Sequence, residues 1–282
     1  MRATTLRATS PSTPTDMHDT LMAAIYFLIA TLVSAIGAIS GIGGGMILKP
    51  VMDSLGTMSV PVISFLTGCA VLSMSSVSLL RSVGKRTMIR LKTSLFLAIG
   101  ASVGGIAGKG IFQYALKLLA RDRYIGIIQA TLLLLLNIAV LLYMVYKGRI
   151  RTFKVLNPMA STVIGLFLGI LASFLGIGGG PINIAVLYCL YSMRPKETVL
   201  NSLFIIFCSQ IASLATSIAA RTVPSFPVER LVLMCSGAIG GSYLGGRISH
   251  RTSERGVEHF FLIVLILLVG INIYNITRFS LM

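Results

Sequence analysis

The pentapeptide Gly-Ile-Gly-Gly-Gly occurs twice in this chain, at Gly41–Gly45 and again at Gly176–Gly180, 135 residues apart. Each copy follows an apolar run long enough to enter a bilayer. Glycine adopts positive φ angles readily, so a run of glycines breaks a membrane helix and leaves backbone N–H groups available to a ligand. Such groups, together with the dipole of the following helix, bind small oxyanions. The predicted backbone donors are those of Gly43, Gly44, Gly45, Gly178, Gly179 and Gly180. Close helix packing is the alternative role for these glycines.

Uncharged polar side chains near the two motifs complete the candidate site: Thr67, Ser73, Asn183, Asn201, Ser202 and Gln210. Hydroxyl and amide groups hydrogen-bond a sulfonate or a carboxylate. The alternative for a Ser or Thr is a bond to the carbonyl four residues earlier in its own helix. We expect Asn201 and Gln210 to face inward because an amide is unfavourable in lipid. The pairing of these residues between the two halves of the chain stays open.

Lys49 follows Gly45 by four residues, in a segment that we place at membrane depth. An ionisable residue at that depth is a functional candidate, and Lys49 could attract an anion. It could equally extend to the membrane surface or pair with Asp53 at i+4. The matching position in the second half is Ile184, so Lys49 does not belong to a symmetric site. We favour the structural role.

The composition indicates an integral helical membrane protein. The 282 residues are 55% hydrophobic and 11% charged, whereas about 25% is typical of soluble domains. The net charge of +16 does not indicate nucleic-acid binding, because Lys and Arg cluster in short connectors between apolar blocks, as they do beside membrane spans. The four cysteines form no CxxC pair and the histidines are scattered, so neither a metal site nor a cofactor is expected.

The predicted fold is all-α, with about eight membrane spans in two repeats of four. The expected spans are 21–38, 60–80, 93–114, 125–146, 161–175, 198–220, 231–248 and 260–276. Each repeat also holds a half-helix or re-entrant segment after its glycine motif, at 46–55 and 181–191. The predicted division is a disordered tail at 1–18, a first repeat at 19–146, a basic linker at 147–158 and a second repeat at 159–282.

Glycines at intervals of four mark the third span of each half: Gly100, Gly104 and Gly108, then Gly237, Gly241 and Gly245. This spacing places them on one helix face, where a neighbouring helix can pack closely. The pattern recurs 137 residues later, close to the spacing of the glycine motifs. An internal duplication explains both recurrences.

These patterns resemble the TauE/SafE-type sulfite exporter family of membrane transporters. The resemblance rests on AIGAISGIGGGMILKPVM and GILASFLGIGGGPINIAVLY, on the glycine-spaced third spans and on the twofold repeat, and it covers residues 20–278. It implies a transporter of sulfur-containing or organic anions such as sulfite, sulfonates or sulfoacetate across the inner membrane. The expected partners are a small anion and the lipid bilayer, without nucleic acid. Self-association stays open.

Three other classes of protein share some of these features. An enzyme is disfavoured because the spans hold no His cluster, carboxylate pair or nucleophile turn, and no ATP-binding loop of the Walker type is present. An anion channel and a membrane subunit of a larger complex are the main alternatives, because broken helices also build selectivity filters.

The distribution of charge predicts an orientation. With eight crossings both chain ends share a side, and that side collects 14 of the 24 Lys and Arg residues, including loop 81–92. The predicted termini are therefore cytoplasmic. The prediction depends on whether the interrupted segments cross the membrane.

Overall fold

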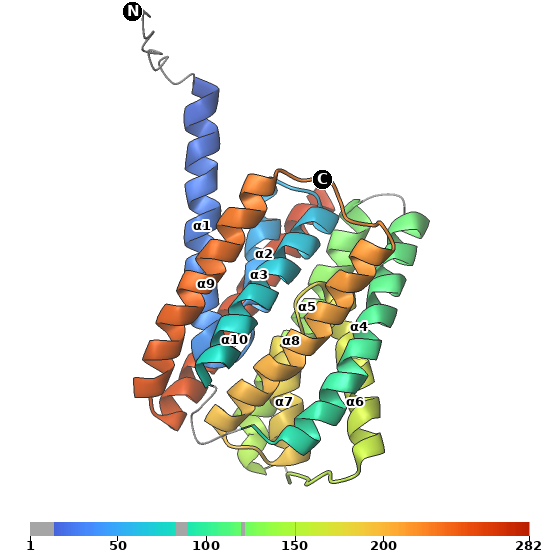
Figure 1. Ribbon diagram of the computed structural model, residues 1–282, viewed down its shortest axis with the longest axis vertical. Helices are drawn as coiled ribbons and strands as arrows, with labels where there is room; N and C mark the ends of the chain where they lie inside the picture. Colours follow the sequence, from blue (N-terminus) through green and yellow to red (C-terminus); the bar gives the residue numbers. More distant parts are fainter. Residues whose placement is uncertain (1–13, 83–88, 120–121, 150, 282) are drawn as a thin grey trace, which may run out of the picture.

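The computed structural model describes residues 14–82, 89–119, 122–149 and 151–281, and their regular secondary structure is entirely helical. The helices are α1 Pro14–Ser40, α2 Gly45–Leu55, α3 Val60–Ser82, α4 Leu91–Leu119, α5 Asp122–Tyr146, η1 Lys147–Arg149, α6 Pro158–Leu175, α7 Gly180–Tyr191, α8 Pro195–Ala219, α9 Val228–Arg251 and α10 Glu254–Leu281. They form an elongated bundle in which the start of α1 and the end of α10 lie at the same end (Figure 1). Of the expected tail, residues 1–13 lie outside the described residues, and Pro14 to His18 belong to α1.

Seven of these helices are long and apolar enough to cross a membrane. They confirm a multi-pass helical membrane protein. The predicted span 231–248 lies in α9, which is 24 residues long but is not among the seven. Five glycines within α9 and the charged residues at its two ends lower its mean hydropathy.

The two glycine motifs break the chain as predicted. Gly41, Gly43 and Gly44 have φ angles of 75°, 77° and 61°. In the second motif Gly176, Gly178 and Gly179 have φ angles of 69°, 75° and 88°. Residues with a side chain rarely adopt these angles, so α1 and α6 end here and the short helices α2 and α7 begin.

Each short helix turns back toward the end of the bundle where its preceding helix began. The Tyr26 hydroxyl in α1 donates to Thr57 Oγ1, just after α2, over 2.7 Å. The Tyr191 hydroxyl at the end of α7 donates to Ser161 Oγ, near the start of α6, over 2.9 Å. Helices α1 and α2 therefore form one hairpin, and α6 and α7 form another that enters from the opposite end of the bundle (Figure 1).

This geometry corrects the predicted sidedness. Because α2 returns to the end where α1 began, α3 starts at that same end and runs to the other (Figure 1). The described parts of loop 81–92 therefore lie opposite the two chain ends. The prediction that this loop shares a side with both termini is wrong. It counted α1 as a complete crossing, whereas α1 and α2 together form a hairpin that returns to the end where it began.

The spaced glycines pack as predicted, and the structure identifies their partners. A Cβ atom added to Gly104 of α4 would lie 2.1 Å from the carbonyl oxygen of Leu166 in α6. A Cβ atom added to Gly241 of α9 would lie 2.0 Å from the carbonyl oxygen of Thr31 in α1. Only glycine fits at such separations. The fourth helix of the chain thus packs on α6, and α9 packs on α1, so the two halves interlock.

Candidate functional site

The two glycine motifs meet inside the bundle. A Cβ atom added to Gly45 would lie 2.5 Å from the carbonyl oxygen of Ile177. A Cβ atom added to Gly180 would lie 1.8 Å from the carbonyl oxygen of Ile42. Ile42 and Ile177 hold the same place in the two motifs, so the contact is reciprocal. The backbones of the two broken helices are in direct contact.

Backbone donors are available at this contact. Gly43, Gly44, Gly178 and Gly179 are buried, and among the described residues no acceptor forms a hydrogen bond with their amides. The amide of Gly45 differs, because it donates to Gly43 O over 2.5 Å. Buried amides are rarely left without an acceptor, which makes these four suitable for binding a ligand.

Thr67 of α3 and Ser202 of α8 are placed alike, one helical turn from the glycine contact. Val71, four residues after Thr67, adjoins Gly45 and Gly178, and Ile206, four residues after Ser202, adjoins Gly43. Both hydroxyls are fully buried and neither has a hydrogen-bond partner among the described residues. These two predicted residues therefore offer unused hydroxyl groups near the motifs. Ser73 does not, because its hydroxyl donates to Cys69 O, the alternative role foreseen for it.

Gln210 and Asn183 also lie against the second motif. A Cβ atom added to Gly178 would lie 3.1 Å from Gln210 Nε2, and one added to Gly179 would lie 3.2 Å from Asn183 Oδ1. Asn183 Oδ1 is buried without a hydrogen-bond partner among the described residues. Amide groups from α7 and α8 therefore border the glycine backbone.

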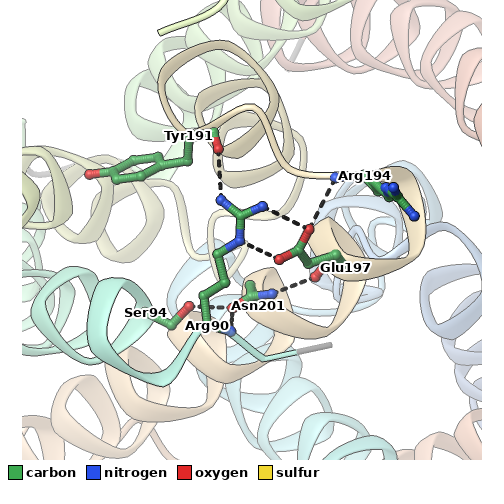
Figure 2. A network of polar contacts seen from close by, with 6 residues as sticks. All are labelled: Arg90, Ser94, Tyr191, Arg194, Glu197 and Asn201. Carbon is green, nitrogen blue, oxygen red and sulfur yellow. Dashed lines mark hydrogen bonds and ion pairs between the residues drawn. The ribbon is translucent and has the colours of Figure 1, made fainter. Parts of the chain in front are cut away.

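Asn201 lies in a different environment, shown in Figure 2. Its Oδ1 accepts hydrogen bonds from the Arg90 amide, over 3.0 Å, and from the Ser94 hydroxyl at the start of α4. Its Nδ2 donates to the carbonyl oxygen of Glu197 over 2.6 Å. The Arg90 guanidinium in turn donates to both carboxylate oxygens of Glu197 and to Tyr191 O. Asn201 faces inward as expected, but it joins α4 to α8 rather than bordering the glycine contact.

Lys49 is engaged in the ion pair that its spacing suggested. Its Nζ lies 2.8 Å from Asp53 Oδ2, and the two side chains are 0% and 5% exposed. Helix α10 holds the same region: Asn275 donates to Pro50 O over 2.8 Å, and Arg278 donates to Asp53 O. The side chain of Lys49 passes Gly176 of the second motif, but its charge is neutralised by Asp53.

Lys109 in α4 was not among the residues predicted from the sequence. This lysine is 8% exposed and lies in a helix apolar enough to span the membrane. The available signal was simply an ionisable residue within an apolar span, the same signal that singled out Lys49.

Comparison with known proteins decides the family. The sequence model of the family described as sulfite exporter TauE/SafE matches residues 26–273, most of the chain. The chain belongs to this family. Its resemblance to that family, read from the glycine motifs, is confirmed, and the family consists of membrane transporters rather than enzymes.

A curated relative supports the same class. The chain is similar to the "Probable membrane transporter protein YunE" of Bacillus subtilis (strain 168), with 24% identity over 266 residues. The match covers 86% of this chain and 94% of the relative. No solved structure gives a significant match.

Proposed function

We propose that this TauE/SafE family member is a secondary transporter of small sulfur-containing or organic anions, such as sulfite, sulfonates or sulfoacetate. The anion binds between two repeats, at the paired glycine breaks. The reciprocal contact of the two motifs carries the proposal. It brings together four buried backbone amides, those of Gly43, Gly44, Gly178 and Gly179, for which the described residues provide no acceptor. Gln210, Asn183, Thr67 and Ser202 add polar groups beside them.

Matched helix bounds and contacts support two repeats, 19–146 and 159–282, joined by the linker 147–158. Helices α2 and α3 begin at Gly45 and Val60, and α7 and α8 begin 135 residues later at Gly180 and Pro195. The α1–α9 packing is matched by the α6–α4 packing. The first hairpin enters from one end and the second from the other, which is the arrangement of inverted repeats with a site at their interface.

Transport requires the close backbone contact to change. The separations at Gly45 and Gly180 leave no room for even a methyl group, so an anion reaches the four amides only when one hairpin moves relative to the other. Small movements of one repeat against the other would expose the site to alternate sides. Glycine at both positions permits this sliding because no side chain blocks it.

The basic end of the bundle faces the cytoplasm in this proposal. Among the described residues, the end opposite the chain termini carries Arg81, Arg90, Lys92, Lys147, Arg149, Arg151, Lys154, Arg194, Lys196, Arg247, Arg251 and Arg255. The end with the chain termini carries Lys117, Arg123, Arg221, Arg230 and Arg278. Basic residues beside membrane spans concentrate on the cytoplasmic side. The termini then lie outside the cytoplasm, the reverse of the orientation expected from eight crossings.

Binding tests the substrate class directly. Purified protein in detergent is heated with sulfite, a sulfonate, thiosulfate or a carboxylate, and the midpoint of unfolding is recorded. A bound anion raises the midpoint with increasing concentration, because it stabilises the folded state by mass action. Sodium chloride at equal ionic strength is the reference. If none of these anions raises the midpoint above that reference, the proposal is contradicted.

A further inference from the structure

Lys109 differs from Lys49, the other buried cation that the structure describes. Among the described residues Lys109 has no ion pair and no hydrogen bond, and its Nζ lies over the ring of Phe112 at 5.2 Å from the centroid. A cation over an aromatic ring gains far less than a cation beside a carboxylate. A buried charge without a partner is unfavourable, and in membrane segments such charges mark substrate or ion pathways.

The other buried lysine provides the contrast. Lys49 is fully buried as well, but Asp53 neutralises it at 2.8 Å within the same helix. Lys109 has no acidic residue in the equivalent position, because Gln113 is four residues after it and Gly105 four residues before it. Of the two buried lysines that the structure describes, Asp53 thus neutralises one and the other is left available.

Lys109 lies close to the proposed anion site. Its neighbour Phe112 packs edge-to-face on Phe174 with ring centroids 6.4 Å apart, and Phe174 precedes the second glycine motif by two residues. Gly105, one helical turn before Lys109, packs on α8, because a Cβ atom added there would lie 3.1 Å from the carbonyl oxygen of Ser209, the residue before Gln210. Gln210 also adjoins α3, because a Cβ atom added to Gly68 would lie 3.2 Å from Gln210 Oε1. Lys109 therefore lies on the face of α4 that packs against the end of α6 and against α8 near Gln210, the amide that borders Gly178.

We propose that Lys109 is the charged residue that binds the transported anion as it enters or leaves the glycine amides. Its ligand is a small oxyanion with a sulfonate, sulfite or carboxylate group, which neutralises the ammonium. This inference rests on the proposed function. It adds that selectivity for anions comes from one buried positive charge on α4, whereas the glycine backbone supplies hydrogen bonds.

A titration of anion-dependent thermal stability separates this role from a structural one. Full-length wild type, Lys109→Met, Lys109→Arg and Lys117→Met are heated in detergent with sodium sulfite or sodium sulfoacetate, against sodium chloride at equal ionic strength. Lys117 is the control because it is an exposed lysine two turns further along α4. Lys109→Gln replaces Lys109→Met if that variant does not fold.

We expect Lys109→Met to bind the anion more than about 30-fold more weakly, since truncating one member of a buried charge pair removes its main attraction. Lys109→Arg should keep much of the affinity and Lys117→Met all of it. Without anion, Lys109→Met should unfold no earlier than wild type, because an unpartnered buried charge is gone.

The opposite pattern overturns the inference. Retained affinity in Lys109→Met within threefold, an anion-free midpoint well below that of wild type, or failure of both neutral variants to fold would assign Lys109 a structural role. A wild type that responds to neither anion would refute the proposed function itself, and this inference with it.

Discussion

The α-carbon of Gly180 lies so close to the carbonyl oxygen of Ile42 that an added Cβ atom would be 1.8 Å from it. Among the glycines of the two motifs, this is the shortest separation for an added Cβ atom. A change of rotamer cannot relieve this clash, because the backbone fixes the position of a Cβ atom and the Ile42 oxygen is itself a backbone atom.

We therefore expect Gly180→Ala to separate the two hairpins and abolish anion-dependent stabilisation. Gly110→Ala is the matched control, because nothing lies within 4 Å of a Cβ atom added there. Unfolding midpoints with and without sulfite measure both effects. Normal sulfite binding by Gly180→Ala would show that the contact does not matter to the site.

Two neighbouring glycines in α9 test the interlocked packing. A Cβ atom added to Gly241 would lie 2.0 Å from Thr31 O, whereas nothing lies within 4 Å of one added to Gly240. Gly241→Ala should therefore lower the unfolding midpoint by several degrees. Gly240→Ala should leave it unchanged or raise it, because alanine is favoured in a helix by about 0.5–1 kcal/mol. Equal midpoints for the two variants would contradict the packing of α9 on α1.

The ion pair between Lys49 and Asp53 predicts a non-additive pair of substitutions. Asp53→Asn should destabilise the protein by about 3–5 kcal/mol, because it leaves the Lys49 ammonium buried and unpaired. The double variant Lys49→Met with Asp53→Leu should recover much of this loss. Chemical denaturation in detergent provides the comparison, and equal losses in the single and double variants would be the contrary result.

The same pair predicts a small effect of Lys49 on anion binding. Because Asp53 already neutralises the lysine, Lys49→Met should reduce sulfite affinity tenfold or less, about 1 kcal/mol. A loss beyond a hundredfold, measured by the same thermal titration, would make Lys49 a principal ligand and would displace the backbone amides from that role.

Orientation is tested by cysteine labelling in whole cells, after the four native cysteines are replaced. A cysteine at Thr222, at the end with the chain termini, should react with a membrane-impermeant thiol reagent added outside. A cysteine at Ser82, at the basic end, should react only after the membrane is opened. The reverse pattern would restore cytoplasmic termini.

Local rules predicted much of this architecture from the sequence. The glycine motifs require positive φ angles, so the helix breaks followed from residue type alone. The interval of four in Gly100, Gly104 and Gly108 likewise indicated close packing, and the i+4 spacing indicated the pairing of Lys49 with Asp53.

The remainder depends on contacts between distant segments. Nothing in the apolar pattern distinguishes a half-helix that continues from a re-entrant segment that returns, so the sequence left both open at 46–55 and the predicted sidedness depended on that choice. Asn201 and Gln210 look alike as buried amides, yet Arg90 from the other half of the chain engages only Asn201. Whether Lys109 had a carboxylate beside it likewise depended on tertiary packing.

Sulfite counterflow in liposomes that contain only the purified chain tests the central claim most directly. The account predicts saturable uptake that unlabelled sulfite inside the liposome accelerates, and loss of that uptake in Gly44→Val and Gly179→Val. Uptake that rises linearly with sulfite and ignores internal sulfite would indicate a channel. Unchanged counterflow in both glycine variants would contradict an anion site at the paired helix breaks.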